Sequence, residues 1–321
     1  MLLAIAACGR RFPMGQYRQL LVLLTAIDPH SAALRRALAL AQVSGAAVHI
    51  VGLFEPYEAH SLHQERLNEA ELQRQYGLYR KQLVELVEHH RSSNTYLTVD
   101  IVKAEDLRDQ AADYIRELKP DMVIKDTETT PALARFFGTP LDCALMRSYQ
   151  GLMHFVPRAA ASLPKRILIA VDTALHDEPD AQMLFNRALI RAADALALQC
   201  DAQVHLLSAY DLVGVFAPDM LVAQTWVEEM RDALQVSFDA LADAEGVPLD
   251  CRHFKEGGAV HVIREQVAAL DIDVLVLGVV QPKGLSKLLG DTTERMVSDP
   301  PCSVLTVHPC VIDTWEPPPC N

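Results

Sequence analysis

Short apolar runs alternate with longer segments of helical periodicity along most of this chain. Residues 18–28 and 165–172 are apolar runs, and residues 31–45 and 180–199 repeat apolar side chains at helical spacing. Short apolar runs bounded by turns are typical of buried strands, and a period near 3.6 residues is typical of helices. The pattern therefore predicts strands that alternate with helices.

The two halves of the chain repeat each other. The next apolar run of each half carries a Val-His pair, at His49 and His205, and each half closes with an apolar strand followed by proline. The segment Asp121–Pro157 aligns with Asp273–Pro309 without a gap. A match of this length indicates an internal duplication, so we expect both halves to share one fold.

Strands that alternate with helices predict βαβ units, and right-handed crossovers then place helices on both faces of a parallel sheet. We predict an α/β chain of two tandem, doubly wound, five-stranded parallel-sheet domains of Rossmann-like type, packed together as a pseudo-dimer. The predicted parts are an N-terminal extension, a first domain, a linker, a second domain and a disordered Pro-rich tail, at residues 1–16, 17–157, 158–163, 164–309 and 310–321.

The charge of the chain narrows the classes of ligand. Acidic side chains exceed basic ones, and the net charge is −13 over 321 residues. Nucleic-acid binding relies on clustered Lys and Arg, and anionic membrane surfaces also attract basic segments. We therefore expect a small ligand or a protein partner, and neither nucleic acid nor a membrane. No apolar run approaches the length of a transmembrane helix.

The cysteines and the start of the chain bear on its location. Seven cysteines are scattered singly, without the spacing of a zinc site or a disulfide framework, which suits a reducing compartment. Residues 5–8 resemble the lipobox of a bacterial lipoprotein, but no basic residue precedes them and the apolar stretch is short. We expect a cytoplasmic protein whose translation starts at Met1 or at Met14.

Ligands of open α/β sheets bind outside the carboxyl ends of the strands. In the second half, the last of the loops at these ends is rich in glycine, so its amides could approach a phosphate. The helix that begins near Thr292 would direct its positive end at such an anion. The candidate ligand-binding residues are Asp172, Ala209, Gly257, Gly278, Lys283, Gly284, Gly290 and Thr292.

Three features together resemble the universal stress protein family. They are an Asp at the end of the first strand, "EGG" before the third helix, and "GLSKLLGDTTE" followed by "CSVLTVHP" near the end. The resemblance extends from about residue 17 to residue 309, and the duplication resembles the tandem-domain members. It implies a cytoplasmic protein of the stress response, with a role in surviving starvation or DNA damage. In ATP-binding members, the pattern G-x2-G-x9-G-[S/T] follows the fourth strand.

This chain departs from that ATP-binding pattern. Gly278 and Gly290 match its outer glycines, but Gln281 replaces the middle glycine, and the spacer after it is one residue short. Asp291 replaces the Ser or Thr. A side chain at 281 narrows the approach of a phosphate, and a carboxylate at 291 repels it or caps the next helix. We expect ATP binding to be weak or absent, and confined to the second half.

The corresponding loops of the first half depart further. Asp126 stands where the second half has Gly278, and Glu105 stands where it has Gly257. The loss of glycines and the gain of carboxylates leave nothing suited to a polyphosphate. We expect this half to be a structural or partner-binding copy.

The sequence predicts no catalytic residue and no metal site. His49 and His205 occupy equivalent strand positions and are explained as core or edge residues, and the two histidines of residues 60–65 lack a third metal ligand. Asp28 and Asp172 are explained by holding a loop or by contacting a ribose or an adenine. No motif combines a nucleophile, a base and an oxyanion donor, so we do not expect an enzyme.

Two alternatives to a binding protein with little affinity for ATP remain open. The second half could be a nucleotide switch with slow ATPase activity, formed by Gly278, Gly284, Gly290 and Thr292. The chain could instead be a scaffold or the carrier of an apolar ligand, because residues 217–246 predict an amphipathic helix with Met and aromatic side chains. Packing of that helix onto its own sheet is the simpler interpretation. We expect either a monomeric pseudo-dimer or a homodimer.

Overall fold

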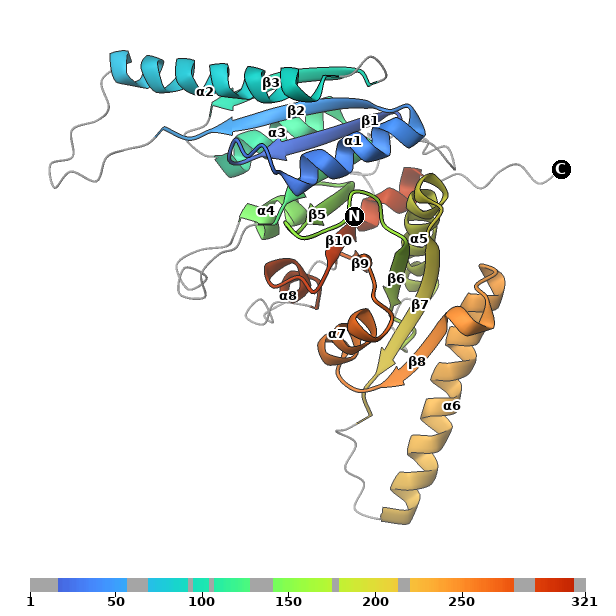
Figure 1. The fold of residues 1–321 in the computed structure, drawn as a ribbon. Helices are drawn as coiled ribbons and strands as arrows, with labels where there is room; N and C mark the ends of the chain where they lie inside the picture. Colours follow the sequence, from blue (N-terminus) through green and yellow to red (C-terminus); the bar gives the residue numbers. More distant parts are fainter. Residues whose placement is uncertain are drawn as a thin grey trace, which may run out of the picture. The chain divides into compact units, whose positions relative to one another are not determined.

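The chain divides into two compact units (Figure 1). The first unit contains Tyr17–Tyr149 and Met153–Ser162, and Leu163–Asn321 belong to the second unit. The side chains of 107–109, 220–225 and 312–314 are not described. The computed structural model describes residues 17–56, 69–91, 95–103, 107–127, 141–174, 179–212, 220–279 and 292–314.

The first unit contains a parallel sheet in the strand order β3-β2-β1-β4-β5. Helices connect successive strands, as a parallel sheet requires. Its elements are β1 (Gln19–Leu24), α1 (Ala32–Ser44), β2 (Ala47–Phe54), α2 (Glu69–His90), β3 (Leu97–Lys103), α3 (Leu107–Leu118), β4 (Met122–Asp126), α4 (Leu141–Ser148) and β5 (Leu152–Val156).

The second unit repeats this order as β8-β7-β6-β9-β10, again with parallel pairing. The predicted α/β fold with parallel sheets is therefore confirmed. Its elements are β6 (Arg166–Val171), α5 (Pro179–Cys200), β7 (Gln203–Tyr210), α6 (Met220–Ala244), η2 (Leu249–Cys251), β8 (Arg252–Glu256), α7 (Ala259–Ala269), β9 (Val274–Gly278), α8 (Thr292–Ser298), β10 (Ser303–Val307) and η3 (Pro309–Thr314).

A carboxylate fixes the start of the first strand in both units. One Oδ2 atom of Asp121 accepts hydrogen bonds from the backbone amides of Arg18 and Gln19, at 2.7 and 2.8 Å. In the second unit, Oδ2 of Asp273 accepts from the amides of Lys165 and Arg166, at 2.8 and 3.0 Å. The two aspartates are partners in the gap-free alignment, so the duplication extends from the sequence to individual hydrogen bonds.

The central strands form the core of each unit. The middle of β1 and the whole of β5 are buried, as are the middle of β6 and the whole of β10. Strands of a parallel sheet covered on both faces are apolar along their length, which explains their continuous Leu, Ile and Val runs. Helices α1 and α5 contribute small Ala and larger Leu side chains to the same core.

The two units differ at the end of their first strand. β6 ends directly before Asp172, but β1 ends at Leu24, four residues before Asp28. Strand register makes Thr25 the counterpart of Asp172, because Leu20 pairs with Met122 as Ile167 pairs with Val274. The sequence suggested that Asp28 ends the first strand. The structure shows that this prediction is wrong, because β1 ends at Leu24. Asp28 lies in the turn before α1, where its carboxylate accepts from the amide of His30 at 2.8 Å.

The beginning of the expected tail is ordered, in contrast to the prediction for 310–321. Helix η3 covers Pro309–Thr314, and Val311 is buried. The amide of Val311 donates to the carbonyl of His308, and the amide of Cys310 donates to His308 Nδ1. The buried side chain of Val311, two residues after Pro309, therefore anchors this segment. The expected extension at 1–16 and residues 315–321 lie outside the described residues.

Candidate functional site

The candidate ligand-binding residues of the second unit follow neighbouring strands of one sheet. Asp172 follows β6, Ala209 lies near the end of β7, Gly257 follows β8, and Gly278 ends β9. Because these strands are parallel, all four residues lie at the same edge. Thr292 begins α8. The other three candidates lie outside the described residues: Lys283, Gly284 and Gly290.

Asp172 holds the loop that follows its strand. Its Oδ1 atom accepts a hydrogen bond from the amide of Ala174 at 3.0 Å, and its carbonyl accepts from Nδ2 of Asn186 at 2.7 Å. Asn186 is a buried residue of α5. The carboxylate itself is exposed, so it shapes the loop and also gives this edge of the sheet a negative charge.

Gly257 adopts a backbone conformation that other residues avoid. Its φ of +133° lies in the region open to glycine, and a Cβ atom there would lie 3.0 Å from Cγ2 of Val262. Its amide donates to the carbonyl of Tyr210 at 2.8 Å. The "EGG" sequence therefore serves to turn the chain from β8 into α7, and its first glycine amide is already used by the protein.

Gly278 is in close contact with an aromatic ring. A Cβ atom at this position would lie 2.5 Å from Cε1 of Phe185, so the ring fills the space that a side chain would need. The Gly278 carbonyl accepts from Oγ1 of Thr293 at 2.7 Å, and Thr293 is buried. The neighbouring Thr292, which the sequence favoured, is less buried than Thr293.

The contact with Phe185 shows which part of α5 lies beside the end of β9. α5 begins at Pro179, so Phe185 lies well inside the helix, where backbone amides bond within the helix itself. In the first unit, by contrast, the amide of Ala33 in the first turn of α1 donates to Asp126 at the end of β4. Among the described residues of the second unit, α5 therefore does not supply at Gly278 the amide donor that α1 supplies at Asp126.

A pocket of about 270 Å³ opens beside the ends of β6 and β7 in the second unit. It includes Ala209, one of the candidates from the sequence. Burial raises the pKa of Tyr210, and the neighbouring Glu256 carboxylate adds to the rise, so this phenol stays neutral at physiological pH. The pocket is lined by Thr173, Ala174, Ser208, Ala209, Tyr210, Asp211, Leu212, Trp226, Met230 and Leu234.

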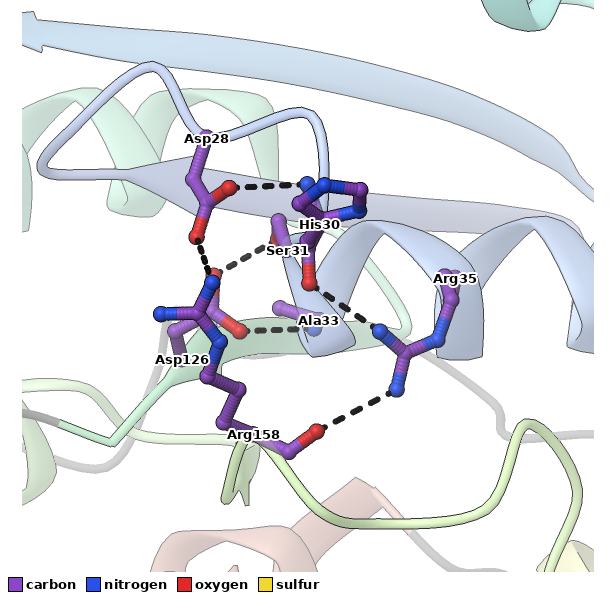
Figure 2. A network of polar contacts seen from close by, with 7 residues as sticks. All are labelled: Asp28, His30, Ser31, Ala33, Arg35, Asp126 and Arg158. Atoms are coloured by element: carbon purple, nitrogen blue, oxygen red, sulfur yellow. Dashed lines mark hydrogen bonds and ion pairs between the residues drawn. The ribbon is translucent and has the colours of Figure 1, made fainter.

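The corresponding edge of the first unit is occupied by Asp126, the counterpart of Gly278 (Figure 2). Oδ1 of Asp126 accepts from the amide of Ala33 at 2.9 Å, and Oδ2 accepts from Oγ of Ser31 at 2.6 Å. Ser31 in turn caps α1 by accepting from the amide of Leu34 at 3.0 Å. The positive end of α1 is therefore bound by a carboxylate of the protein itself.

The segment after β5 closes over the same edge. Arg158 lies 3.6 Å from the Asp28 carboxylate, and its carbonyl accepts a 3.4 Å hydrogen bond from Arg35 (Figure 2). Arg35 also donates to the carbonyls of His30 and Ala160, at 3.0 and 3.1 Å. Residues 158–161 are thus fastened onto α1. This strap is the first part of the linker expected at 158–163.

A second arginine and a histidine anchor the strap from inside. Arg36 is fully buried and donates to the carbonyl of Ala161 at 2.8 Å and to Nε2 of His154 at 3.0 Å. Burial, together with the Arg36 guanidinium, holds the pKa of His154 well below its usual value. The ring is therefore neutral and accepts from Arg36 through Nε2.

Lys125 and Asp142 form a buried ion pair next to Asp126. Nζ of Lys125 lies 2.7 Å from Oδ1 of Asp142, and both residues are almost inaccessible to solvent. Nζ also donates to the carbonyl of Asp126 at 3.2 Å. This pair joins the end of β4 to the first turn of α4, so it holds the start of that helix against the strand.

The equivalent histidines of the two units make different contacts. His49 bonds through both ring nitrogens, to Thr98 at 2.6 Å and to Tyr114 at 2.7 Å. His205 lies 3.1 Å from the ring nitrogen of His253. Burial lowers the pKa of all three imidazoles, which are therefore neutral at pH 7. These contacts agree with the prediction that His49 and His205 are core or edge residues.

No described helix is both long enough and apolar enough to cross a membrane. Among the described residues, no group of three or more His, Cys, Asp or Glu side chains could hold a metal ion.

Several site residues could not be found from the sequence. Ser31, Ala33 and Arg158 reach the first unit's edge only through the fold, because they lie far from Asp126 in sequence. The presence of Asp126 at a position where the second half has glycine indicated that this edge is closed. It did not indicate which residues bond to the Asp126 carboxylate. Trp226 was recognised within an amphipathic segment, whereas the hydroxyls of the pocket had no sequence signal.

Comparison with known proteins identifies the family. The model of the universal stress protein family matches residues 164–308. The chain is 30% identical to a universal stress protein E homolog of Haemophilus influenzae over 194 residues, which are 59% of this chain and 62% of that protein. It is 31% identical to universal stress protein A homolog 1 of Coxiella burnetii, over 44% of this chain and 95% of that protein.

A solved structure shows the same fold over almost the whole length. A functionally unknown protein from Pseudomonas aeruginosa PAO1 superposes with a TM-score of 0.71 at 20% identity, over 92% of this chain and 94% of that one. The parallel sheets, the paired Asp121 and Asp273 contacts and these matches lead to one conclusion. The chain belongs to the universal stress protein family.

Proposed function

We propose that this protein acts in stress resistance, such as survival of starvation or DNA damage, by binding a ligand or a partner rather than by catalysis. Its ATP binding is weak or absent. Membership of the universal stress protein family supports the role in stress. The matched part covers less than two thirds of the Haemophilus relative, so the partners of the complete protein belong to the proposal too.

One observation carries the proposal. The Asp126 carboxylate accepts from the amide of Ala33, in the first turn of α1, and from the Ser31 hydroxyl, at the edge where a nucleotide phosphate would need positive groups. A phosphate brought there would meet a carboxylate at contact distance, and two like charges at about 4 Å repel by several kcal/mol at intermediate dielectric. The first unit is therefore a structural or partner-binding copy.

Two features weaken ATP binding in the second unit. The ring of Phe185 lies against Gly278 and keeps the amides of α5 away from this edge. Gln281 and Asp291, which the sequence places in the loop that would hold phosphates, lie outside the described residues. Their side chains reduce the access of phosphate to the backbone and add negative charge.

A binding role also agrees with the contacts of the hydroxyl and histidine side chains near the sheets. The pocket-lining hydroxyls of Thr173 and Ser208 bond to each other at 2.9 Å, and the histidines nearest the sheets are neutral and engaged by neighbouring side chains. In the described part of the chain, we find no nucleophile held by a base beside an oxyanion donor. We therefore propose that the protein is not an enzyme.

The location and the assembly belong to the same proposal. The cysteines are scattered singly along the chain, which suits the reducing cytoplasm. The net charge of −13 favours small ligands or protein partners over nucleic acid and membranes. We propose a cytoplasmic protein that is either a monomer with internally paired halves or a homodimer.

A nucleotide switch in the second unit is the second candidate. It is favoured by Gly278, which keeps a bare backbone at the end of β9 where the first unit has Asp126. Its loop is anchored at the far end by Thr293, whose hydroxyl donates to the Gly278 carbonyl. In this alternative, ATP binds at the second unit only and is hydrolysed slowly.

Thermal unfolding in the presence of ATP and Mg²⁺ separates the two candidates. A ligand at 100 times its Kd raises the free energy of unfolding by about 2.7 kcal/mol. We expect no saturable rise for the wild-type protein at millimolar ATP. The variant Gln281→Gly/Asp291→Ser, which approaches the ATP-binding pattern, is the matched control. A saturable rise in the wild type that Gly290→Asp removes would establish the switch instead.

A further inference from the structure

Two histidines of the second unit share one face of neighbouring strands. His205 lies near the start of β7, and His253 lies near the start of β8, the last strand in the sheet order of this unit (Figure 1). The register partner of His253 is Leu207, two residues after His205, so both imidazoles lie on the same face of the sheet.

The two imidazoles are in direct contact. Nδ1 of His205 lies 3.1 Å from Nε2 of His253, and the ring centres are 5.3 Å apart. His205 is buried and His253 is half-buried. In a hydrogen bond between two imidazoles, one ring donates its N–H and the other accepts through a lone pair. The contact therefore holds a single hydrogen between the rings.

This contact cannot survive protonation of both rings. A protonated imidazole carries a hydrogen on each nitrogen and has no acceptor left. Two protonated rings would direct two N–H groups at each other across 3.1 Å, and their positive charges would repel. The pair therefore keeps its hydrogen bond with no charge or with one charge, and loses it with two.

The charges around the pair do not compensate for a second proton. Burial lowers the pKa of His205, which the carboxylate of Asp250 in η2 raises and Arg166 of β6 lowers. Burial also lowers the pKa of His253, and the charges of His205 and of Lys255 in β8 lower it further. One carboxylate among these groups faces two cations, so a doubly protonated pair has no net negative charge to stabilise it.

The other groups packed around the pair are neutral or already paired. The Cys251 thiol accepts from Nε2 of Gln203 at 3.3 Å, and Arg252 lies 2.7 Å from Asp243. α5, α6 and α7 pack against β7 or β8, and none of their described residues that is buried is an Asp, Glu, Lys, Arg or His. The helices therefore add no buried charge to the pair.

The first unit has a carboxylate at the position of His253. Asp100 pairs with Val51, two residues after His49. His253 pairs in the same way with the residue two positions after His205. Strand register therefore makes Asp100 the counterpart of His253. The first unit combines a histidine with a carboxylate, whereas the second combines two histidines.

His49 can take up a proton without losing its contacts. Its ring nitrogens lie 2.6 Å from the hydroxyl of Thr98 and 2.7 Å from that of Tyr114, and a hydroxyl can accept as well as donate. Tyr114 donates to Asp100 at 3.0 Å. Burial lowers the pKa of His49, but the Asp100 charge opposes this change. The conflict between two protonated rings thus belongs to the second unit.

We propose that His205 and His253 form an acid-sensitive latch. In mild acid the pair takes up a second proton, the hydrogen bond between the rings breaks, and β8 separates locally from β7 while the centre of the sheet stays formed. β8 leads directly into the turn at Gly257, so this turn becomes responsive to acidity. The latch goes beyond the proposed binding role and does not depend on it, because neither histidine lines the pocket.

Hydrogen exchange of the intact chain tests the latch. Protection factors, corrected for the intrinsic pH dependence of exchange, are measured for segments that cover β8 and β6 between pH 7.5 and pH 5. Each proton that is bound on opening shifts the opening equilibrium by up to about tenfold per pH unit. We expect the protection of β8 to fall about tenfold or more over this range, and to fall further than that of β6.

Three variants assign the effect to the pair. His253→Gln can still bond to His205 but does not titrate, so most of the acid-induced loss at β8 should disappear. His253→Asp reproduces the arrangement of the first unit, and its carboxylate should hold or raise the protection of β8 as the pH falls. His261→Gln removes an exposed histidine of α7 and should behave like the wild type.

Circular dichroism at pH 7.5 confirms that each variant is folded before exchange is measured. Equal acid-induced losses at β8 in the wild type and in His253→Gln would overturn the latch. So would an unchanged protection of β8 in the wild type, or a loss at β6 as large as the loss at β8, which would indicate global unfolding.

Discussion

Lys125 and Asp142 form an ion pair in which both side chains are almost inaccessible to solvent. Removing each charge from water is unfavourable in free energy. The attraction between the two buried charges offsets this desolvation cost. The pair therefore adds specificity to the position of α4 more than it adds net stability. Its value is visible only when one partner is removed.

We predict that Asp142→Ala lowers the free energy of unfolding by about 3–5 kcal/mol, because it leaves the Lys125 ammonium buried without a partner. The double variant Lys125→Met/Asp142→Leu should recover most of the loss, since it removes both charges and keeps the volume. Urea unfolding followed by circular dichroism measures both. A double variant as unstable as Asp142→Ala would contradict the explanation.

His154 predicts a pH dependence of stability. Burial, aided by Arg36, holds its pKa in the folded protein well below 6.5, while the unfolded chain keeps the ordinary value. The neutral ring therefore contributes stability that is present above about pH 6.5 and is lost as the pH falls, because protons then bind to the unfolded chain.

The variant His154→Gln isolates this contribution from the other histidines. Below about pH 6.5 the difference in unfolding free energy between wild type and variant should shrink by up to about 1.4 kcal/mol per pH unit, the slope for one proton. Unfolding midpoints measured between pH 7.5 and pH 5 test it. A difference that does not change with pH would show that His154 is not buried as a neutral ring.

Helix α1 holds the strap 158–161 through two adjacent arginines, Arg35 and Arg36. The same helix has its N-terminus bound by Asp126, so one element closes the edge of the first unit from two sides (Figure 2). In the second unit, Phe185 lies beside Gly278, and it belongs to the interior of α5 rather than to its first turn. The two sheet edges thus differ in which part of the helix lies beside them: the first turn of α1 in the first unit and the interior of α5 in the second.

We predict that Arg35→Ala loosens the strap. Its guanidinium holds three carbonyl groups, and hydrogen bonds from a charged donor are worth about 1.5–3 kcal/mol each. Trypsin should then cleave after Arg158 about tenfold faster, or more, under native conditions. Arg80→Ala, an exposed change on α2, serves as the control. Equal cleavage rates in wild type and Arg35→Ala would exclude the strap.

The order and type of the elements could be predicted because apolar periodicity and a duplicated pattern determine them locally. The end of β1 could not, since the apolar run continues past Leu24 to the turn at Asp28. The start of η3 was also missed, because the anchoring of Val311 depends on burial within the fold. Short helical turns in a Pro-rich segment leave little trace in the sequence.

The candidate site was predicted in outline and not in its contacts. The rule that ligands bind at the carboxyl ends of parallel strands correctly indicated which loops meet at one edge. The bond between Thr293 and the Gly278 carbonyl, and the ring of Phe185 against that glycine, arise from side chains brought together by folding. Such contacts need the three-dimensional structure.

We propose that the two units use one fold for different tasks. The first unit closes its sheet edge with Asp126, Arg158 and Asp28, and the second keeps Gly278 and a pocket beside α6. Duplication followed by divergence explains this division, because one copy is free to lose ligand binding while the other keeps an open site. In this account the first unit supports structure or a partner, and the second binds a ligand.

The nucleotide content of the purified protein tests the central claim most directly. The protein is isolated from the cells that make it, denatured, and the released small molecules are quantified by chromatography against the protein concentration. The account predicts far less than one adenine nucleotide per chain. A stoichiometric amount of ATP that remains bound through purification would contradict it.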